Sequence, residues 1–241
     1  MEDLIARITE NYNWAGALLS FVGIIVVTKL GKYVLFKIPA LAEARTANRA
    51  EDKTKLAKDK YPPTVKANQQ VGLYLNLTFF LAILPFCVTT QAQPWWQVIR
   101  DVVMVLVIYD FFYYLMHRFL FHGQGRLRQV HAIHHQARSP TYIDAHYVHP
   151  FETFLGLSLF FIVIVGWTLA AGQLHVISVA LMYVAYVQLN QLNHVKMELP
   201  YFPFRLATGI TRTHHKHHIN MQMGNYASIV PLYDKLFGTY E

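Results

Sequence analysis

Five stretches of this chain are each long and apolar enough to cross a lipid bilayer. A hydrocarbon core of roughly 30 Å needs about 20 mainly apolar residues in a helix. The five runs cover residues 14–36, 71–90, 98–116, 151–171 and 174–193. Backbone amides are satisfied within a helix, so each run is predicted to be helical. The predicted fold class is therefore an all-α integral membrane bundle of about four to five transmembrane helices, forming one domain over residues 1–241.

The composition supports a membrane protein over a soluble one. Hydrophobic residues make up 54% of the chain and charged residues 15%, which also excludes intrinsic disorder. The net charge of +7 could suggest nucleic acid, but with this apolar content the bilayer is the better anionic partner, and no nucleic-acid binding is expected. The single cysteine, Cys87, excludes a disulfide framework or a multi-thiolate metal site. Any bound metal is expected to have nitrogen and oxygen ligands.

The distribution of basic residues predicts the orientation of the spans. Residues 29–70 hold ten Lys and Arg, whereas the loops at 91–97 and 171–175 hold no charged residue. Because basic loops stay in the cytoplasm, the N-terminus is expected outside and residues 117–150 and 194–241 inside, as a histidine-rich helical cap. That cap would carry 12 of the 13 histidines. The polar stretch 43–66 is helix-compatible up to Tyr61 and ends at Pro62-Pro63; it is expected to contact anionic lipid or, alternatively, an acidic electron carrier.

The cytoplasmic histidines recur at short, regular spacings. One H-x2-H-H trio is formed by His131, His134 and His135, and a second by His214, His217 and His218, with His215 added. Residues three and four apart share a helix face, so each trio is expected to aim its imidazoles at one point. Chance is a poor explanation for two trios of identical spacing on one side of the membrane.

Further histidines stand at the ends of the spans. His117 and His122 follow the third span, and a five-residue step turns about 140° around an ideal helix, so this pair converges only if the helix ends or bulges there. His194 follows the fifth span, and His146 and His149 lie in the connector before the fourth. His146 could support the site or lie on the loop surface. His175, on the other side, is expected to be a polar cap.

This many imidazoles exceeds the first shell of one metal ion, so two metals are the economical interpretation. Imidazole suits zinc, copper, iron and nickel, and the location at the mouth of an apolar bundle favours redox iron. The expected ligands are the following: His117, His122, His131, His134, His135, His149, His194, His214, His215, His217 and His218. Asp110 lies seven residues before His117 and is expected to orient a ligand histidine in the catalytic site; the alternative is a hydrogen bond to a Tyr or Trp of a neighbouring helix.

These motifs resemble the membrane-bound fatty acid hydroxylase and sterol desaturase superfamily of di-iron oxygenases, over roughly residues 98–241. Besides the histidine boxes, the resemblance includes His149-Pro150-x-Glu152 and the closing Gly224-Asn225-Tyr226-Ala227-Ser228. Those two pieces look most like the sterol 4-methyl oxidase branch, whereas the H-x4-H first box looks like the fatty acid 2-hydroxylases. Asn190 stands where 2-hydroxylases commonly have a histidine. Either the ligand set is one short or His149 takes part.

The resemblance implies an enzyme that uses two iron ions and O2 to hydroxylate or oxidise a C–H bond, possibly a methyl group, of a sterol-like or other lipid. The alternatives are a fatty acyl or carotenoid hydroxylase or desaturase. The chain has no Rossmann, haem or iron–sulfur motif, so a separate donor such as cytochrome b5 or ferredoxin with an NAD(P)H reductase is expected. Two alternative functions come from other protein classes. A divalent-metal transporter would place histidines at mid-membrane, whereas here no histidine lies near the middle of an expected span. A membrane cytochrome would pair histidines across two spans to bind haem, which the dense trios do not resemble.

Overall fold

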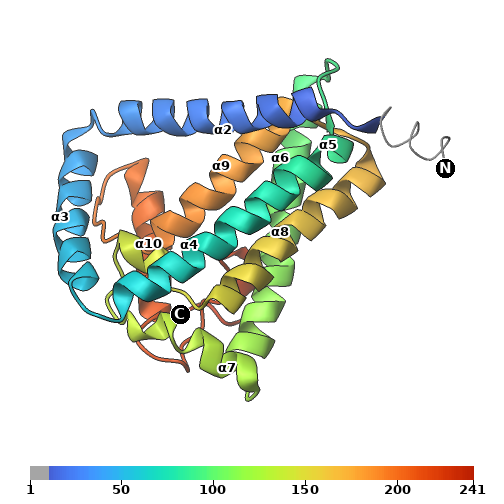
Figure 1. Ribbon diagram of the computed structural model, residues 1–241. Helices are drawn as coiled ribbons and strands as arrows, with labels where there is room; N and C mark the ends of the chain where they lie inside the picture. The colour runs from blue at the N-terminus through green and yellow to red at the C-terminus, as the bar shows by residue number, and fades with distance from the viewer. Residues whose placement is uncertain (1–10) are drawn as a thin grey trace.

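The computed structural model describes residues 11–241, and these are almost entirely helical (Figure 1). Residues 1–10, which carry part of the expected outer N-terminus, lie outside the described residues. The long helices are α2 (Trp14–Leu35), α3 (Pro39–Leu56), α4 (Tyr61–Thr78), α6 (Trp95–Leu115), α8 (Pro150–Ala171), α9 (Val176–Asn193) and α10 (Phe204–His217). The shorter elements are η1 (Phe79–Ile83), α5 (Leu84–Cys87), η2 (Met116–Phe121), α7 (Arg126–His131), η3 (His134–Gln136), η4 (Tyr142–Ala145) and α11 (Leu232–Leu236). Two strands, β1 (Val88–Thr89) and β2 (Leu174–His175), pair in parallel.

All five expected spans are helical, which confirms the all-α membrane fold. Three helical segments are long and apolar enough to cross a membrane by length and composition: Trp14–Leu35, Tyr61–Cys87 and Pro150–Ala171. The other two expected spans are more polar. Arg100, Asp101 and Asp110 lie in α6, and the last turns of α9 are rich in Asn and Gln.

The second span begins earlier than the sequence pattern suggested. The expected stop at Pro62-Pro63 is instead the first turn of α4, and the preceding helix α3 already ends at Leu56. Proline is tolerated in a first helical turn because the amides there have no partner within the helix. The helix that continues through η1 to Cys87 is therefore longer than the apolar run alone.

The long helices pack as a bundle that α2 crosses at one end (Figure 1). Helix α4 packs on α8, and α6 packs on both α8 and α9. Helix α2 runs along the top of the view and packs on α9, and α3 then turns down along the left edge. Most apolar side chains of α2 are exposed, as expected for a helix that faces lipid.

Aromatic side chains fill the centre of the bundle. The rings of Phe79 and Phe161 stack with centroids 3.9 Å apart, and those of Phe160 and Tyr186 stack at 4.0 Å. Tyr109 meets Phe160 edge-on and is 1% exposed. These contacts join η1, α6, α8 and α9 into one core, which fixes where the ends of the spans lie.

A hydrogen bond to a buried carboxylate of α6 joins this helix to α8 at the end away from the histidines. Asp101 is 2% exposed, and its Oδ1 accepts from Arg100 and, at 3.0 Å, from the Trp167 indole of α8. A carboxylate inside a span is costly unless it is paired, and here three N–H groups satisfy it. A short turn joins α8 to α9, with Gly172 at a φ of 93° that disfavours other residues.

Candidate metal centre

Nine buried or nearly buried histidines gather into two groups at one end of the bundle. The five-histidine cluster contains His117, His122, His131, His135 and His217. The four-histidine cluster contains His134, His194, His214 and His218. Within each cluster the ring nitrogens that could act as ligands all lie within 4.8 Å of one another. Two metal ions, one in each cluster, could therefore be held by imidazole nitrogen alone.

Each H-x2-H-H trio contributes to both clusters, which corrects the expectation that a trio aims at one point. His131 and His135 enter the five-histidine cluster, whereas His134 enters the other. The second trio divides the opposite way, because His214 and His218 enter the four-histidine cluster and His217 the first. Positions four apart share a direction on a helix, while the third residue points about 60° to one side. One short segment can therefore hold two neighbouring metal ions.

A π-helical turn aligns His117 with His122. Residues 116–121 form η2, and the amide of His122 donates to the His117 carbonyl at 2.9 Å, five residues back. The wider π-helical turn brings positions five apart onto one face. The two imidazole centroids lie 4.9 Å apart. This is the bulge that the H-x4-H spacing requires, so the conditional prediction from the sequence is confirmed.

Oxygen acceptors around the clusters orient most of the rings. The Nδ1 atoms of five histidines pair with backbone carbonyls: His117 with Tyr226 (2.6 Å), His122 with Met221 (3.0 Å), His134 with Tyr147 (3.2 Å), His194 with Asn190 (3.0 Å) and His217 with Gly224 (2.7 Å). A carbonyl can only accept, so each of these rings donates its Nδ1–H. The lone pair of each is then on Nε2, which is directed into its cluster.

This arrangement fits a bound cation. Burial holds the pKa of His117 and His131 well below the usual range, so both are neutral at pH 7. His117 donates Nδ1–H to Tyr226, and His131 pairs through Nδ1 with the Glu152 carboxyl at 2.8 Å. When the Glu152 carboxyl is ionised, His131 donates Nδ1–H to it, and the Nε2 atoms of His117 and His131 then face each other at 3.0 Å without a proton to share. Two facing lone pairs repel, and a metal ion between them would relieve the repulsion.

Unpartnered ring nitrogens point to the same conclusion. His122 Nε2 is buried without a hydrogen-bond partner among the described residues. Burial lowers the pKa of His122 to about 4, despite its bond to the Met221 carbonyl, so this nitrogen is free to bind a metal at neutral pH. In the other cluster, His134 and His194 both donate Nδ1–H to carbonyls while their Nε2 atoms lie 3.0 Å apart. The donor sets of both clusters suit a divalent transition metal.

Two carboxylates have roles that the sequence did not indicate. Glu152, from the His-Pro-x-Glu stretch, carries the carboxyl that orients a cluster histidine, and it is 5% exposed. The partners of Asp110 differ from those expected: its oxygens accept the backbone N–H groups of Ser228, Ile229 and Val230 at 2.8–3.3 Å. Asp110 therefore anchors the C-terminal loop to α6 and does not orient a histidine.

Asp234 holds the other side of the same loop. Its carboxylate accepts from the amides of Tyr226 and Ala227, at 2.7 and 2.9 Å, and from the Thr239 hydroxyl. The carbonyl of Tyr226 is the acceptor for His117, so the closing Gly-Asn-Tyr-Ala-Ser motif positions the five-histidine cluster from outside.

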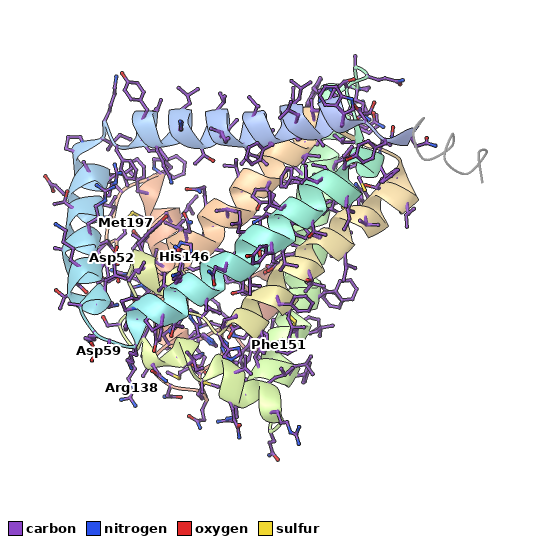
Figure 2. The ribbon with its side chains drawn as sticks, viewed as in Figure 1. Asp52, Asp59, Arg138, His146, Phe151 and Met197 are labelled. Atoms are coloured by element: carbon purple, nitrogen blue, oxygen red, sulfur yellow. The ribbon has the colours of Figure 1, made fainter. Side chains whose placement is uncertain are left out.

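The remaining histidines lie outside both clusters. His149 caps α8 by accepting the Phe151 amide at 3.1 Å, and His175 caps α9 in the same way through Ile177. His215 lies on α10 and bonds to the backbone of His194. His146 lies beside α4 in Figure 2 and lines a cavity next to the four-histidine cluster. The structure thus does not bring His149 and His215 to either group.

A cavity of about 390 Å³ extends from the four-histidine cluster into the bundle. This volume falls within the usual range of small-molecule sites, about 300–1,000 Å³. At the cluster end its walls include His134, His194 and Glu152, and deeper in the bundle they include Tyr109 and Leu157. Helices α4, α6, α8 and α9 all contribute. A ligand in this cavity would lie between membrane helices with one end beside a possible metal ion.

Comparisons with known proteins agree with this site. The family model described as "Fatty acid hydroxylase" matches residues 102–239. "Methylsterol monooxygenase 1" of Rattus norvegicus is 32% identical over 180 residues, covering 70% of this chain and 57% of the relative. "Methylsterol monooxygenase 1" of Gallus gallus is 31% identical, covering 62% and 49%. "Very-long-chain aldehyde decarbonylase GL1-11" of Oryza sativa subsp. indica is 33% identical, covering 60% and 54%.

The chain spans about half the length of these curated relatives. No solved structure matches it. The residues matched by the family model include all the histidines of both clusters and no residue of α2 to α5. The similarity is therefore concentrated on the part of the chain that builds the site.

Proposed function

Because the chain belongs to the fatty acid hydroxylase family, in the sterol 4-methyl oxidase branch of the superfamily, we propose that it is an O2-dependent membrane oxidoreductase acting on a lipid. The reaction would be hydroxylation or oxidation of a C–H bond, including that of a methyl group, in a sterol-like or other lipid. The observation that carries this proposal is the cavity between membrane helices that ends at an all-histidine cluster.

The two clusters would each hold one iron ion. His117, His122, His131, His135 and His217 would hold the first, and His134, His194, His214 and His218 the second. When bound, the irons would supply the redox chemistry by which O2 oxidises an unactivated C–H bond, which no amino-acid side chain can do. His149 and His215 are not included, because neither lies in a cluster.

The residues of the chain would position the substrate and exclude water. The cavity walls reach the four-histidine cluster through His134 and His194, so the carbon to be oxidised would lie at that end. Glu152 also lines this end, with Oε1 on His131 and Oε2 buried and unpartnered among the described residues. Its free oxygen could hold a proton near the substrate while its other oxygen orients a ligand.

The proposal includes a membrane orientation and a redox partner. The two metal-binding regions, residues 117–150 and 194–241, would lie on the cytoplasmic side of a single membrane-embedded domain. Each turnover requires two electrons from outside the chain, and the expected donor is a small carrier such as cytochrome b5 or ferredoxin with its NAD(P)H reductase. The exposed basic residues of α3, among them Arg49 and Lys53, offer complementary charge to an acidic carrier.

Lipid mass spectrometry on cells with and without the gene tests the proposal. Hydroxylation adds about 16 mass units, desaturation removes about two, and methyl oxidation gives a carboxylic acid, as the atoms added or removed require. The product should disappear when His134→Ala or His218→Ala replaces the wild type. Unchanged product from either variant would refute the site, and an absence of any oxidised lipid from the wild type, supplied with a reductase system, would refute the activity.

A further inference from the structure

A polar pair lies inside the membrane-spanning part of the bundle, away from the histidines. Tyr183 of α9 donates its hydroxyl hydrogen to Oδ1 of Asn76 on α4. The Asn76 side-chain amide in turn donates to the Gly72 carbonyl at 2.8 Å. Polar side chains are expensive at this depth and usually have a function.

The pair lines the cavity and joins two helices that scarcely touch elsewhere. Helix α4 packs on α8, while α9 packs on α2, α6 and α10. Both Asn76 and Tyr183 are only half-buried and form part of the cavity wall. A hydrogen bond that served only to clamp two helices would not need to be in contact with this space.

The hydrogen-bonding capacity that remains is specific. The hydroxyl hydrogen of Tyr183 is used on Asn76, and one of the two Asn76 amide hydrogens is used on Gly72. Lone pairs on the Tyr183 hydroxyl oxygen and on Asn76 Oδ1 are left over, together with the second amide hydrogen of Asn76. These groups favour a ligand that can both donate and accept a hydrogen bond, such as an alcohol.

The position of the pair sets the length of that ligand. Tyr183 precedes His194 by 11 residues along α9, a separation of about 16 Å at the rise of an α-helix. The carbon attacked would lie close to the four-histidine cluster, within about 3–4 Å of the reacting group. The hydroxyl and the reacting carbon would thus be on the order of 10–15 Å apart.

We propose that the cavity binds a lipid whose hydroxyl group lies about 10–15 Å from the carbon that is oxidised, and that Tyr183 and Asn76 bind this hydroxyl. The proposal rests on the proposed function, which places the reacting carbon beside His134 and His194. It makes the two residues determinants of substrate specificity at the end of the cavity remote from the chemistry.

A matched pair of lipids tests the proposal by binding alone. Methyl 12-hydroxydodecanoate and methyl dodecanoate differ only in the terminal hydroxyl, and their dissociation constants are measured by equilibrium dialysis against the purified, metal-loaded full chain in detergent. The ratio of the two constants is compared among variants, which cancels the different micelle partitioning of the lipids. Replacing Tyr183 and Asn76 together, as Tyr183→Phe with Asn76→Leu, should lower the preference for the hydroxylated ester about fivefold to tenfold, the effect of one hydrogen bond.

Tyr74→Phe is the control, because Tyr74 lies on α4 like Asn76, is 66% exposed, and is not part of the cavity wall. It should leave the ratio unchanged. The single variant Tyr183→Phe, which keeps the packed ring, replaces the double variant if the latter does not fold, and should reduce the ratio at least twofold. An unchanged ratio, or equal weakening of both esters, would overturn the proposal. A preserved hydroxyl preference in a protein that oxidises no lipid would instead count against the proposed function alone.

Discussion

At the scale of single residues, the division of the histidine boxes predicts how metal is lost. His214 belongs to the four-histidine cluster, whereas His149 only caps α8. We expect His214→Ala to lower the iron content from about two ions per chain to about one, because the other cluster shares none of its ligands. His149→Asn, which preserves the cap, should leave the iron content unchanged. Elemental analysis of the purified protein measures both, and metal loss from the His149 variant would show that it is a ligand.

The contact between Glu152 and His131 leads to a second prediction, which concerns metal affinity. The Glu152 carboxylate accepts from His131 Nδ1 and so increases the basicity of the nitrogen directed at the metal. Glu152→Gln leaves a weaker acceptor, and we expect the metal affinity of the five-histidine cluster to fall about 10- to 100-fold. Competition with a chelator measures this affinity. Glu43→Gln, at an exposed position on α3, is the control, and equal affinities in the two variants would contradict the role of Glu152.

At the scale of elements, the π-helical turn η2 decides whether the first box can work. An alanine inserted between Phe119 and Leu120, both exposed, would separate His117 and His122 by six residues. That step is about 240° on an α-helix, so the two rings would diverge. We expect loss of the metal in the five-histidine cluster alone. The control is an alanine inserted between Gln124 and Gly125, after the box, which leaves the spacing of His117 and His122 unchanged. Measuring the iron content of the two insertion variants distinguishes them.

The contact between α6 and α8 predicts a change in stability rather than in metal binding. Trp167→Phe removes the indole N–H from buried Asp101, while Arg100 remains as a partner. Loss of a hydrogen bond to a charged group costs about 1.5–3 kcal/mol, and we expect the free energy of unfolding to fall toward the lower value because Arg100 can adjust. Denaturant unfolding in detergent measures it. Trp96→Phe, at a 52% exposed position, should change stability little.

At the scale of the whole molecule, the proposed topology can be tested with cysteine labelling. The single native cysteine, Cys87, is 4% exposed and can be replaced by serine to give a background without thiols. Lys58→Cys, after α3, should react with a membrane-impermeant maleimide only from the cytoplasmic side. Ala92→Cys, between β1 and α6, should react only from the other side. Labelling of both positions from the same side of sealed vesicles would overturn the proposed topology.

The whole fold also explains why a short chain suffices for two histidine clusters. The ends of α6, α9 and α10 meet at one end of the bundle, with η3 beside them, so histidines distant in sequence become neighbours. His117 and His217 are 100 positions apart, yet their ring centroids lie 4.7 Å apart. The spans supply the rigid frame, and the segments at their ends supply the clustered histidines.

The sequence by itself determined the helical membrane class, the family and the set of histidines from which the two clusters are built. These follow from local quantities: the length of an apolar run, the side on which basic residues collect and the spacing of residues along one helix. The spacing of His117 and His122 also indicated that the helix must end or bulge there if the two converge, because a five-residue step cannot converge on a regular α-helix, and the structure has the bulge.

Only the tertiary structure decided how the histidines divide and which carboxylates support them. Helical periodicity places His131, His134 and His135 relative to one another but says nothing of the partners from α9 and α10 that complete each cluster. The partners of Asp110 were likewise undecided, since the loop that it binds is more than 100 residues away in sequence. Local rules establish the direction of a side chain on its own element, and the packing of elements establishes what that side chain meets.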